Sequence, residues 1–159
     1  DSAGGNLAAA VSLMARDRGE FRPGRQILIY PALDSRHSED SPYPSVRENG
    51  TGYLLTAKRV RDYMALYRSS DEDLTNPYFA PLRASSLANQ PDTLLITAEY
   101  CPLRDEGEAY GRRLREEGGF VEIHRLPDAL HGYFSLPVRF SLVKQTYGIM
   151  NRFLERRHE

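Results

Sequence analysis

Two short apolar runs, at residues 27–30 (ILIY) and 93–98 (TLLITA), restrict the folds available to this chain. Each run is apolar on both of its faces, which is typical of a strand buried in a parallel sheet. A third candidate strand, at residues 120–126, alternates apolar and polar side chains and is expected nearer to a sheet edge. We therefore expect a parallel sheet of at least three strands.

Helical patterns separate these candidate strands. The apolar residues that define the four patterns are Leu7, Ala8, Val11 and Ala15; Val60, Tyr63, Met64 and Tyr67; Ala109, Tyr110 and Leu114; and Phe140, Val143, Tyr147, Met150 and Leu154. Thr56 can cap the second helix, and Gly118 and Gly119 close the third. Helices that alternate with buried strands predict an α/β fold, in which a mostly parallel sheet is covered by helices on both faces.

The composition is that of an ordinary globular domain and argues against several classes of partner. The 159 residues include 21 Lys and Arg against 22 Asp and Glu, so the net charge of -1 gives no electrostatic case for nucleic acid or an anionic membrane. The single cysteine, Cys101, excludes an intrachain disulfide, and four scattered histidines do not match a structural zinc pattern. With no membrane-spanning run and no signal-peptide pattern, we expect a cytoplasmic protein.

Residues 34–53 form a long segment without regular periodicity that is rich in Ser, Pro, Asn and Gly. This excursion leaves the carboxyl end of the first predicted strand, which is where α/β folds place their ligand sites. Long loops within compact domains are usually functional or mobile. We therefore expect the excursion to contribute to a ligand site.

The chain opens with DSAGGN and runs directly into the first predicted helix. A serine flanked by small residues at a helix entry matches the nucleophile elbow G-x-S-x-G without its first glycine. In such a turn Ser2 is strained with its hydroxyl exposed, and a side chain at a flanking glycine position would collide with the neighbouring strand and helix. The amide of Ala3 would point at a developing oxyanion. The alternative is a disordered stub or a simple helix cap.

A second candidate, His131, follows the third predicted strand in the run LHGYF. A loop histidine beyond the carboxyl end of a strand can reach an elbow serine as a general base. The alternative for a His-Gly pair is an ordinary turn. The other histidines are weaker candidates, since His37 lies in the excursion, His124 in a strand and His158 in the tail.

The loop after the second predicted strand, residues 99–107, reads EYCPLRDEG. Triads on this kind of fold follow the chain order serine, acid, histidine, so the acid is expected between Ser2 and His131. Asp105 and Glu106 lie in this interval. The alternative is that both carboxylates only stabilise the amino terminus of the following helix through its dipole.

Five motifs together resemble the hormone-sensitive-lipase-like branch of the α/β-hydrolases, which includes bacterial carboxylesterases. They are DSAGGNLA at residues 1–8, IYPALD at 29–34, NPYFAPL at 76–82, PLRDEG at 102–107 and LHGYF at 130–134. The resemblance implies an α/β-hydrolase fold and a serine carboxylesterase that needs neither a metal nor an organic cofactor. It implies Ser2 as nucleophile, His131 as general base and Ala3 as donor of one oxyanion N–H, with esters of short or medium acyl chains as substrates.

The same resemblance suggests where the ester binds. The excursion and a cap-like segment together span about residues 34–70. We expect the part of this region up to Tyr67 to line the acyl or alcohol pocket. Tyr133 and Phe134 lie beside His131 in the sequence and are candidates for the same wall. Core packing is an equally good alternative for Phe134.

The chain departs from the family pattern at the triad acid. Family members usually have the aspartate of an Asp-Pro-Leu loop where this chain has Cys101. A neutral thiol is a poor hydrogen-bond acceptor and cannot stabilise an imidazolium as a carboxylate does. Either the activity is low or another acid substitutes, with Asp105 as the first candidate and Glu99 and Asp128 behind it. Cys101 is disfavoured as the nucleophile because Ser2 already has that role.

Family members also have a further amino-terminal half, with the earlier strands and a His-Gly-Gly motif that supplies the other oxyanion donors. We therefore interpret residues 1–159 as the carboxyl-terminal half of one α/β-hydrolase domain. The strand at residues 27–30 then has an open apolar edge, which favours pairing with another chain. Besides a small ester, the expected partner is the missing amino-terminal half or a second copy of this chain.

Two other functions are consistent with the same residues. A compromised triad on this fold can bind a small molecule without hydrolysing it, as in some plant hormone receptors of the family. Cys101 favours this alternative, whereas the retained Ser2 and His131 favour the enzyme. A fragment with no function of its own would show no ester turnover until the amino-terminal half was added.

Overall fold

The computed structural model describes residues 1–156, so His158 lies outside the described residues. The helices are α1 (Ser2–Arg18), α2 (Pro44–Glu48), α3 (Ala57–Tyr67), α4 (Arg104–Glu116) and α5 (Ser141–Glu155), and the strands are β1 (Arg25–Ile29), β2 (Asp92–Tyr100) and β3 (Val121–Leu130). Short 3-10 helices span Asp71–Thr75, Pro81–Arg83 and Tyr133–Ser135. Within residues 1–156, no helix combines the length and the apolar character that crossing a membrane requires.

The strands form one parallel sheet in the order β1-β2-β3. Ile27 of β1 lies opposite Leu94 of β2, and Leu95 of β2 lies opposite Ile123 of β3. Strand β3 continues to Leu130, beyond the predicted end of the strand, after an irregularity in its pairing with β2. The predicted α/β class and the parallel sheet are confirmed.

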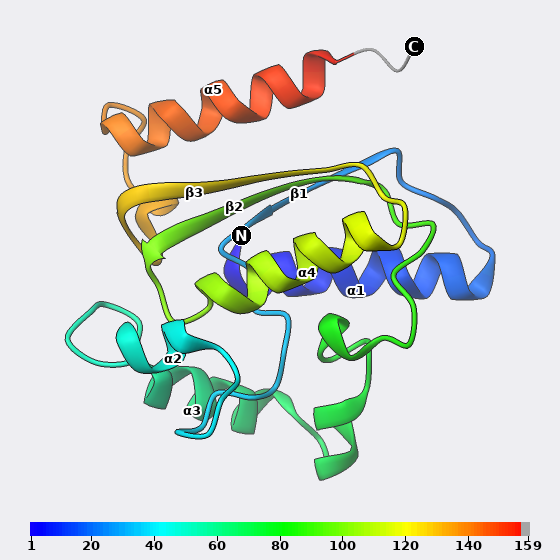
Figure 1. The fold of residues 1–159 in the computed structure, drawn as a ribbon, viewed down its shortest axis with the longest axis horizontal. Coiled ribbons are helices and arrows are strands. Elements are labelled where there is room, and N and C mark those ends of the chain that lie inside the picture. Colours follow the sequence, from blue (N-terminus) through cyan, green and yellow to red (C-terminus); the bar gives the residue numbers. More distant parts are fainter. Residues whose placement is uncertain (157–159) are drawn as a thin grey trace.

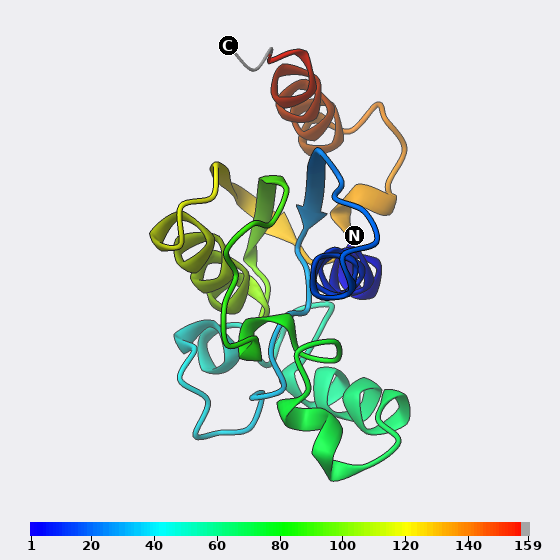
Figure 2. The ribbon, with the colours of Figure 1, turned by 90° about the vertical axis from the view of Figure 1, so that its right-hand side faces the viewer.

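Helices cover both faces of the sheet, as predicted (Figures 1 and 2). Helix α5 lies on one face, and α1 and α4 lie side by side on the other. The core on the α5 side includes Leu94, Ile96, Leu126, Ile149 and Phe153. The core on the side of α1 and α4 includes Leu13, Leu28, Leu95, Tyr110 and Leu114. Burial of these two apolar layers is the main favourable contribution to folding.

Helix α1 buries a different face from the one that its apolar pattern predicts. Ala9 and Leu13 are buried, whereas Leu7 and Val11 are 51% and 50% exposed. Leu7 and Val11 instead line a groove with Ile27 along β1, whose outer edge has no neighbouring strand among the described residues. The predicted face is wrong because Leu7 and Val11 point toward this open edge, while Ala9 and Leu13 pack against the sheet.

Helix α5 is also rotated relative to its prediction. Val143 is buried as expected, but Tyr147 and Leu154 are exposed, and the buried stripe continues through Ile149 and Phe153. The helix has apolar residues on two adjacent stripes, and only one of them faces the sheet. The sequence pattern alone could not distinguish the two.

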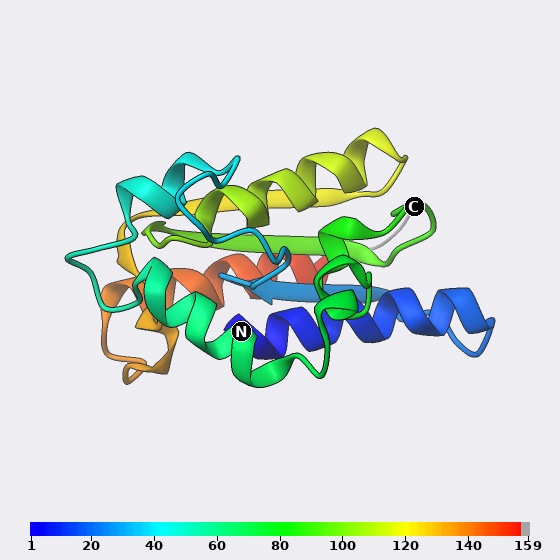
Figure 3. The same ribbon diagram turned by 90° about the horizontal axis from the view of Figure 1, so that it is seen from below.

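The excursion at residues 34–53 is irregular apart from α2, as predicted, and polar contacts hold it in place. The buried carboxylate of Asp34 accepts hydrogen bonds from Arg36 at 2.7 Å and from Arg83 at 2.9 Å. The side-chain amide of Asn49 donates to the carbonyl of Glu99 at 3.0 Å. The chain then leads into α3, which lies beside the amino-terminal end of α1 (Figure 3).

Candidate active site

Ser2 lies in the first turn of α1 in a strained backbone conformation. Its φ is 48°, in the left-handed region that residues other than glycine rarely adopt. At Gly5 a Cβ would lie 2.9 Å from the Cβ of Pro31, so only glycine allows α1 to approach the loop after β1 this closely. At Gly4 a Cβ would meet nothing within 4 Å in the described residues, so the expected collision occurs at Gly5 and not at Gly4. This close approach fixes the turn that presents Ser2.

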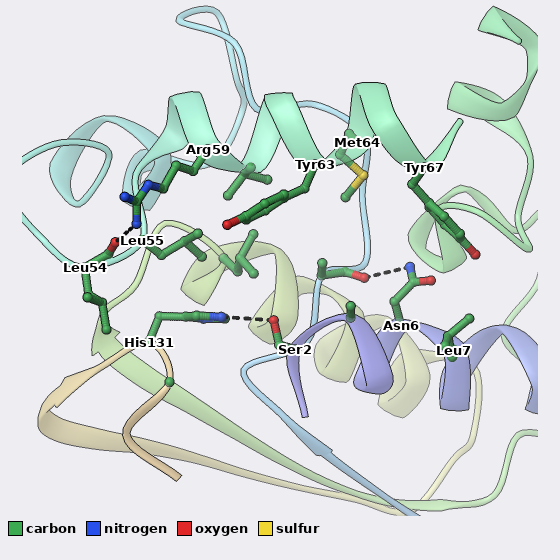
Figure 4. Close-up of a pocket in the computed structure, with 15 residues that line it drawn as sticks. Ser2, Asn6, Leu7, Leu54, Leu55, Arg59, Tyr63, Met64, Tyr67 and His131 are labelled. Carbon is green, nitrogen blue, oxygen red and sulfur yellow. Dashed lines mark hydrogen bonds between the residues drawn. The ribbon is translucent and has the colours of Figure 1, made fainter. Parts of the chain in front are cut away.

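The structure brings Ser2 and His131 together (Figure 4). The Oγ of Ser2 lies 3.0 Å from Nε2 of His131, which is hydrogen-bond distance. His131 directly follows β3, and the φ of 87° at Gly132 turns the chain away from the sheet. A serine hydroxyl at this distance can pass its proton to the imidazole.

Cys101 contacts the other nitrogen of the His131 ring. Its Sγ lies 3.2 Å from Nδ1 and accepts a hydrogen bond from the amide of Leu103 at 3.4 Å. The thiol is fully buried, immediately after the carboxyl end of β2. When Nδ1 carries the ring proton and donates it to the sulfur, Nε2 is free to accept the proton of Ser2. Ser2, His131 and Cys101 thus form one continuous row of contacts.

The structure does not bring Asp105 to His131. The Asp105 carboxylate accepts a hydrogen bond from the amide of Ser45 at 2.7 Å and forms an ion pair with Arg104 at 2.8 Å. Burial alone would raise the pKa of Asp105, but Arg104 and Ser45 more than offset this and lower its pKa. Asp105 lies in the first turn of α4, where a carboxylate interacts favourably with the helix dipole, as in the alternative role.

The two reserve candidates for the acid, Glu99 and Asp128, contact each other. The amide of Asp128 donates to the Glu99 carboxylate at 2.8 Å. Neither side chain is among the hydrogen-bond partners of the His131 ring, which are Ser2 and Cys101 in the described part of the chain.

Burial sets the protonation of both His131 and Cys101. It lowers the pKa of His131 to about 4 and raises the pKa of the Cys101 thiol to about 12. At neutral pH both side chains are therefore uncharged. His131 is available as a base over a wide pH range, but within residues 1–156 no carboxylate is hydrogen-bonded to the ring to stabilise the imidazolium that a proton transfer would form.

Tyr30 is a contact of His131 to which the sequence pattern assigned no role. The two ring centroids are 4.6 Å apart, and the Tyr30 hydroxyl donates to the carboxylate of Asp1 at 3.0 Å. The φ of Tyr30 is 37°, again in the left-handed region. Tyr30 therefore connects His131 to Asp1, the residue before Ser2. Its position between the apolar run of β1 and Pro31 is the signal that could have identified it.

Ser2 and His131 open onto a cavity of about 390 Å³, formed by α1, α3 and loops at the carboxyl end of the sheet (Figure 4). The other residues that line it are Ala3, Asn6, Leu7, Ala32, Leu54, Leu55, Arg59, Val60, Tyr63, Met64, Tyr67, Leu103 and Gly132. Most of these side chains are apolar. A cavity of this size and character suits a small molecule that carries an apolar group.

The lining of this cavity corrects two expectations. The segment from residue 54 to Tyr67 lines it as predicted, but residues 34–53 are absent from its described lining. Tyr133 and Phe134 are absent as well. Tyr133 is instead buried in the core. Its hydroxyl lies 2.7 Å from that of Thr146 in α5.

The remaining described histidines lie in other contacts. His37 is buried with Nε2 at 2.5 Å from the carboxylate of Glu106, and His124 lies 3.2 Å from Glu122. Burial opposes the charge on His37, but Glu106 more than compensates and raises its pKa. The pair of His37 and Glu106 joins the excursion to α4 and has a structural role.

The match to a known family agrees with this geometry. The sequence pattern of the family described as "alpha/beta hydrolase fold" matches residues 1–135. An arylesterase from Saccharolobus solfataricus is 39% identical over 137 residues, which cover 86% of this chain and 43% of the arylesterase. An ethyl acetate hydrolase from Pseudomonas putida is 34% identical over 137 residues, which cover 86% of this chain and 42% of that protein.

Solved structures give the same result. A thermophilic carboxylesterase from a metagenomic library matches 94% of this chain with a TM-score of 0.86 and 32% identity, over 50% of its own length. An ester hydrolase from the metagenome of Lake Arreo matches 98% of this chain with a TM-score of 0.83 and 38% identity, also over 50% of its length. The chain spans about half the length of these relatives or less. It belongs to the α/β-hydrolase fold family, and its resemblance to the hormone-sensitive-lipase-like carboxylesterases is confirmed.

Proposed function

We propose that this chain carries the catalytic serine and histidine of a carboxylic ester hydrolase. The observation that supports this most strongly is the 3.0 Å contact between Ser2 and His131 at the floor of an apolar cavity. The strained φ of Ser2, which exposes its hydroxyl, is independent support. The activities named for the related proteins agree with the proposal.

The proposed reaction has two steps through an acyl-enzyme. The Ser2 Oγ attacks the ester carbonyl carbon while its proton moves to Nε2 of His131, and the amide of Ala3 donates to the carbonyl oxygen as that oxygen becomes negative. Collapse of the tetrahedral intermediate breaks the bond to the alcohol, which leaves with the proton from His131. Water then attacks the acyl-Ser2 with His131 again as base, and the acid is released as Ser2 recovers its proton.

Cys101 is proposed as the third member of this arrangement, in place of Asp105. Its sulfur accepts a hydrogen bond from the Nδ1–H of His131 and thereby orients the ring, which is the part of the acid's role that a neutral group can fulfil. It does not supply the negative charge that stabilises the imidazolium. The turnover is therefore expected to be slower than with a carboxylate at the same position.

The activity is proposed for a longer polypeptide that contains this chain. Relatives that are about twice as long contain further parts of the fold. Additional strands of this kind would pair with the open edge of β1, beside the groove. Such strands would cover Leu7 and Val11, which are half exposed without them. A second copy of the chain is the other occupant that this edge could accept.

Short or medium acyl chains are the proposed substrates. A cavity of about 390 Å³ is at the lower end of the volumes typical of ligand sites, and its apolar lining favours an aliphatic or small aromatic group. Long lipid chains would extend beyond the described walls.

Replacement of the nucleophile tests the proposal. In the longer polypeptide, Ser2→Ala should abolish the hydrolysis of a short-chain aryl ester such as phenyl butyrate, because it removes the proposed site of acylation. Ser12→Ala is the matched control: Ser12 lies in the same helix, buried beside Gln26, and should leave turnover within about twofold. Equal turnover by the wild type and Ser2→Ala would overturn the proposal.

A binding protein without turnover is the second candidate, and the neutral Cys101 is the observation that favours it. This alternative predicts that short-chain esters bind in the cavity and are recovered unchanged. Calorimetric binding followed by analysis of the recovered ligand would distinguish the two candidates.

A further inference from the structure

Arg59 places a positive charge in the wall of the cavity, and no acidic residue in the described part of the chain pairs with it. Among the described residues that line the cavity, it alone carries a permanent charge. Its Nη1 donates to the carbonyl of Leu54 at 3.3 Å, and no carboxylate within residues 1–156 forms an ion pair with it. Lys58, one residue earlier, is paired with Asp62 at 2.7 Å. An unpaired guanidinium beside an apolar cavity suits a carboxylate, which it can bind through two parallel N–H donors.

The local structure fixes the backbone of Arg59, whose side chain is exposed. The side chain of Thr56 accepts a hydrogen bond from the amide of Arg59 at 3.2 Å, which fixes Arg59 in the first turn of α3. That turn contains no acidic residue. The partial positive charge of the helix amino terminus therefore adds to the charge of the guanidinium.

Arg59 lies at the end of the cavity next to His131 (Figure 4). Leu54, which accepts the hydrogen bond from Arg59, extends its Cδ2 to 3.9 Å from where a Cβ would stand on Gly132. Gly132 directly follows His131. Arg59, Leu54 and His131 thus lie at the same end of the cavity.

The opposite end of the cavity is formed by other residues. Tyr67 stacks on Phe79 with ring centroids 5.0 Å apart, and the side-chain amide of Asn6 donates to the carbonyl of Phe79 at 2.8 Å. Asn6 lies one helical turn after Ser2, away from His131. Ser2 lies between the two ends (Figure 4).

The direction of proton transfer decides which part of an ester occupies each end. His131 gives its proton to the oxygen of the leaving alcohol, so the alcohol part must lie on the His131 side of Ser2. The acyl chain then extends toward Tyr67. We propose that the enzyme selects esters whose alcohol part carries a carboxylate, and that Arg59 binds this carboxylate. The inference rests on the proposed ester hydrolysis.

A pair of matched aryl esters tests the inference in the longer polypeptide. The probes are para-acetoxybenzoate, which carries a carboxylate on its leaving phenol, and its neutral primary amide, para-acetoxybenzamide. Arg59→Gln should lower kcat/KM for the charged probe about tenfold and for the neutral probe less than about twofold. Comparing each variant with the wild type removes the intrinsic difference in reactivity between the two esters. Arg59→Lys, which keeps the charge without the planar donors, should give an intermediate loss.

Lys58→Gln is the control, because it removes the same charge one residue away, outside the cavity lining. It should leave the ratio of the two kcat/KM values unchanged. The inference is overturned if Arg59→Gln leaves the ratio unchanged, or if Lys58→Gln changes it equally.

Two further measurements separate this inference from the proposed function. Monophenyl succinate carries its carboxylate on the acyl side, and its hydrolysis relative to that of phenyl butyrate should not depend on Arg59; an equal dependence would overturn the assignment of the two ends. Binding of the product para-hydroxybenzoate, measured by calorimetry, should weaken about tenfold in Arg59→Gln whether or not the ester is turned over. Unchanged binding would overturn the role of Arg59 even in an active esterase.

Discussion

At the scale of single residues, the surroundings of His131 define the chemistry of the site. Ser2 contacts one ring nitrogen, Cys101 contacts the other, and Tyr30 packs against the ring. The sequence motifs predicted the meeting of Ser2 and His131. They could not show that Asp105 would instead bind Ser45 and Arg104. Cys101 and Asp105 lie in the same predicted loop, and only the three-dimensional path of that segment decides which of the two contacts His131.

Replacing Cys101 by aspartate should increase activity. A carboxylate beside Nδ1 would stabilise the imidazolium, so we expect kcat to rise at least about tenfold at neutral pH. Cys101→Asn is the matched control, because it has the shape of aspartate without its charge, and it should give no increase. A steady-state assay with a short-chain aryl ester measures both variants. A fall in activity for Cys101→Asp in a protein that remains folded would contradict the proposed position of Cys101.

The pH profile should change in the same variant. His131 must be neutral to act as base, and burial lowers its pKa to about 4, so kcat/KM of the wild type should stay high as the pH falls and decline only near pH 4. In Cys101→Asp the adjacent negative charge raises the pKa of His131 and moves this decline to higher pH. Circular dichroism at each pH separates titration from unfolding. A wild-type decline centred on the ordinary histidine pKa would show that His131 is not desolvated.

At the scale of elements, close packing of α1 against the loop after β1 shapes the turn at Ser2. The sequence predicted the helix and the strand, because their apolar patterns are clear. It did not predict which face of α1 is buried, since Leu7 and Val11 make that face apolar and nothing local shows that it points to a sheet edge. Gly5 indicates the close packing of α1 against the loop after β1, whereas the apolar pattern of α1 does not.

Gly5→Ala should destabilise the protein. The added methyl group would lie 2.9 Å from the rigid ring of Pro31, so we expect a loss of about 1 to 3 kcal/mol in the free energy of unfolding. Gly148→Ala, in the middle of α5, is the control, because its Cβ would meet only the flexible end of Arg152 at 3.5 Å. That substitution should stabilise the protein by up to about 1 kcal/mol. Urea unfolding measures both, and equal effects would contradict the packing described for Gly5.

At the scale of the whole molecule, β1 has one paired edge and one open edge in the described chain. The resemblance to longer relatives led us to expect this edge from the sequence, and the groove of Leu7, Val11 and Ile27 beside it is the structural counterpart. Both proposed occupants of the edge lie outside these residues, so neither the local pattern nor the propensities of this chain could identify the occupant.

Val11→Lys should weaken the pairing of this edge with the segment that precedes it in the proposed longer polypeptide. A charge in the middle of the groove would have to be desolvated, so we expect at least about a tenfold weaker association between the two separately purified parts. Leu66→Lys is the control, since Leu66 is also apolar and exposed (83%, against 50% for Val11) but lies on α3, outside the groove. Sedimentation measures the complex. Loss of a dimer of this chain in Val11→Lys, with no effect on the mixed complex, would identify a second copy as the occupant.

The most direct test of the whole account is covalent labelling of the longer polypeptide with a serine-directed phosphonate, followed by peptide mapping. We predict phosphonylation of Ser2, because its hydroxyl lies 3.0 Å from the proposed base His131 and faces the cavity. The label should be absent from Ser2→Ala and much slower to form in His131→Ala. An unlabelled Ser2 in a folded protein, or labelling that does not depend on His131, would contradict the proposed ester hydrolase.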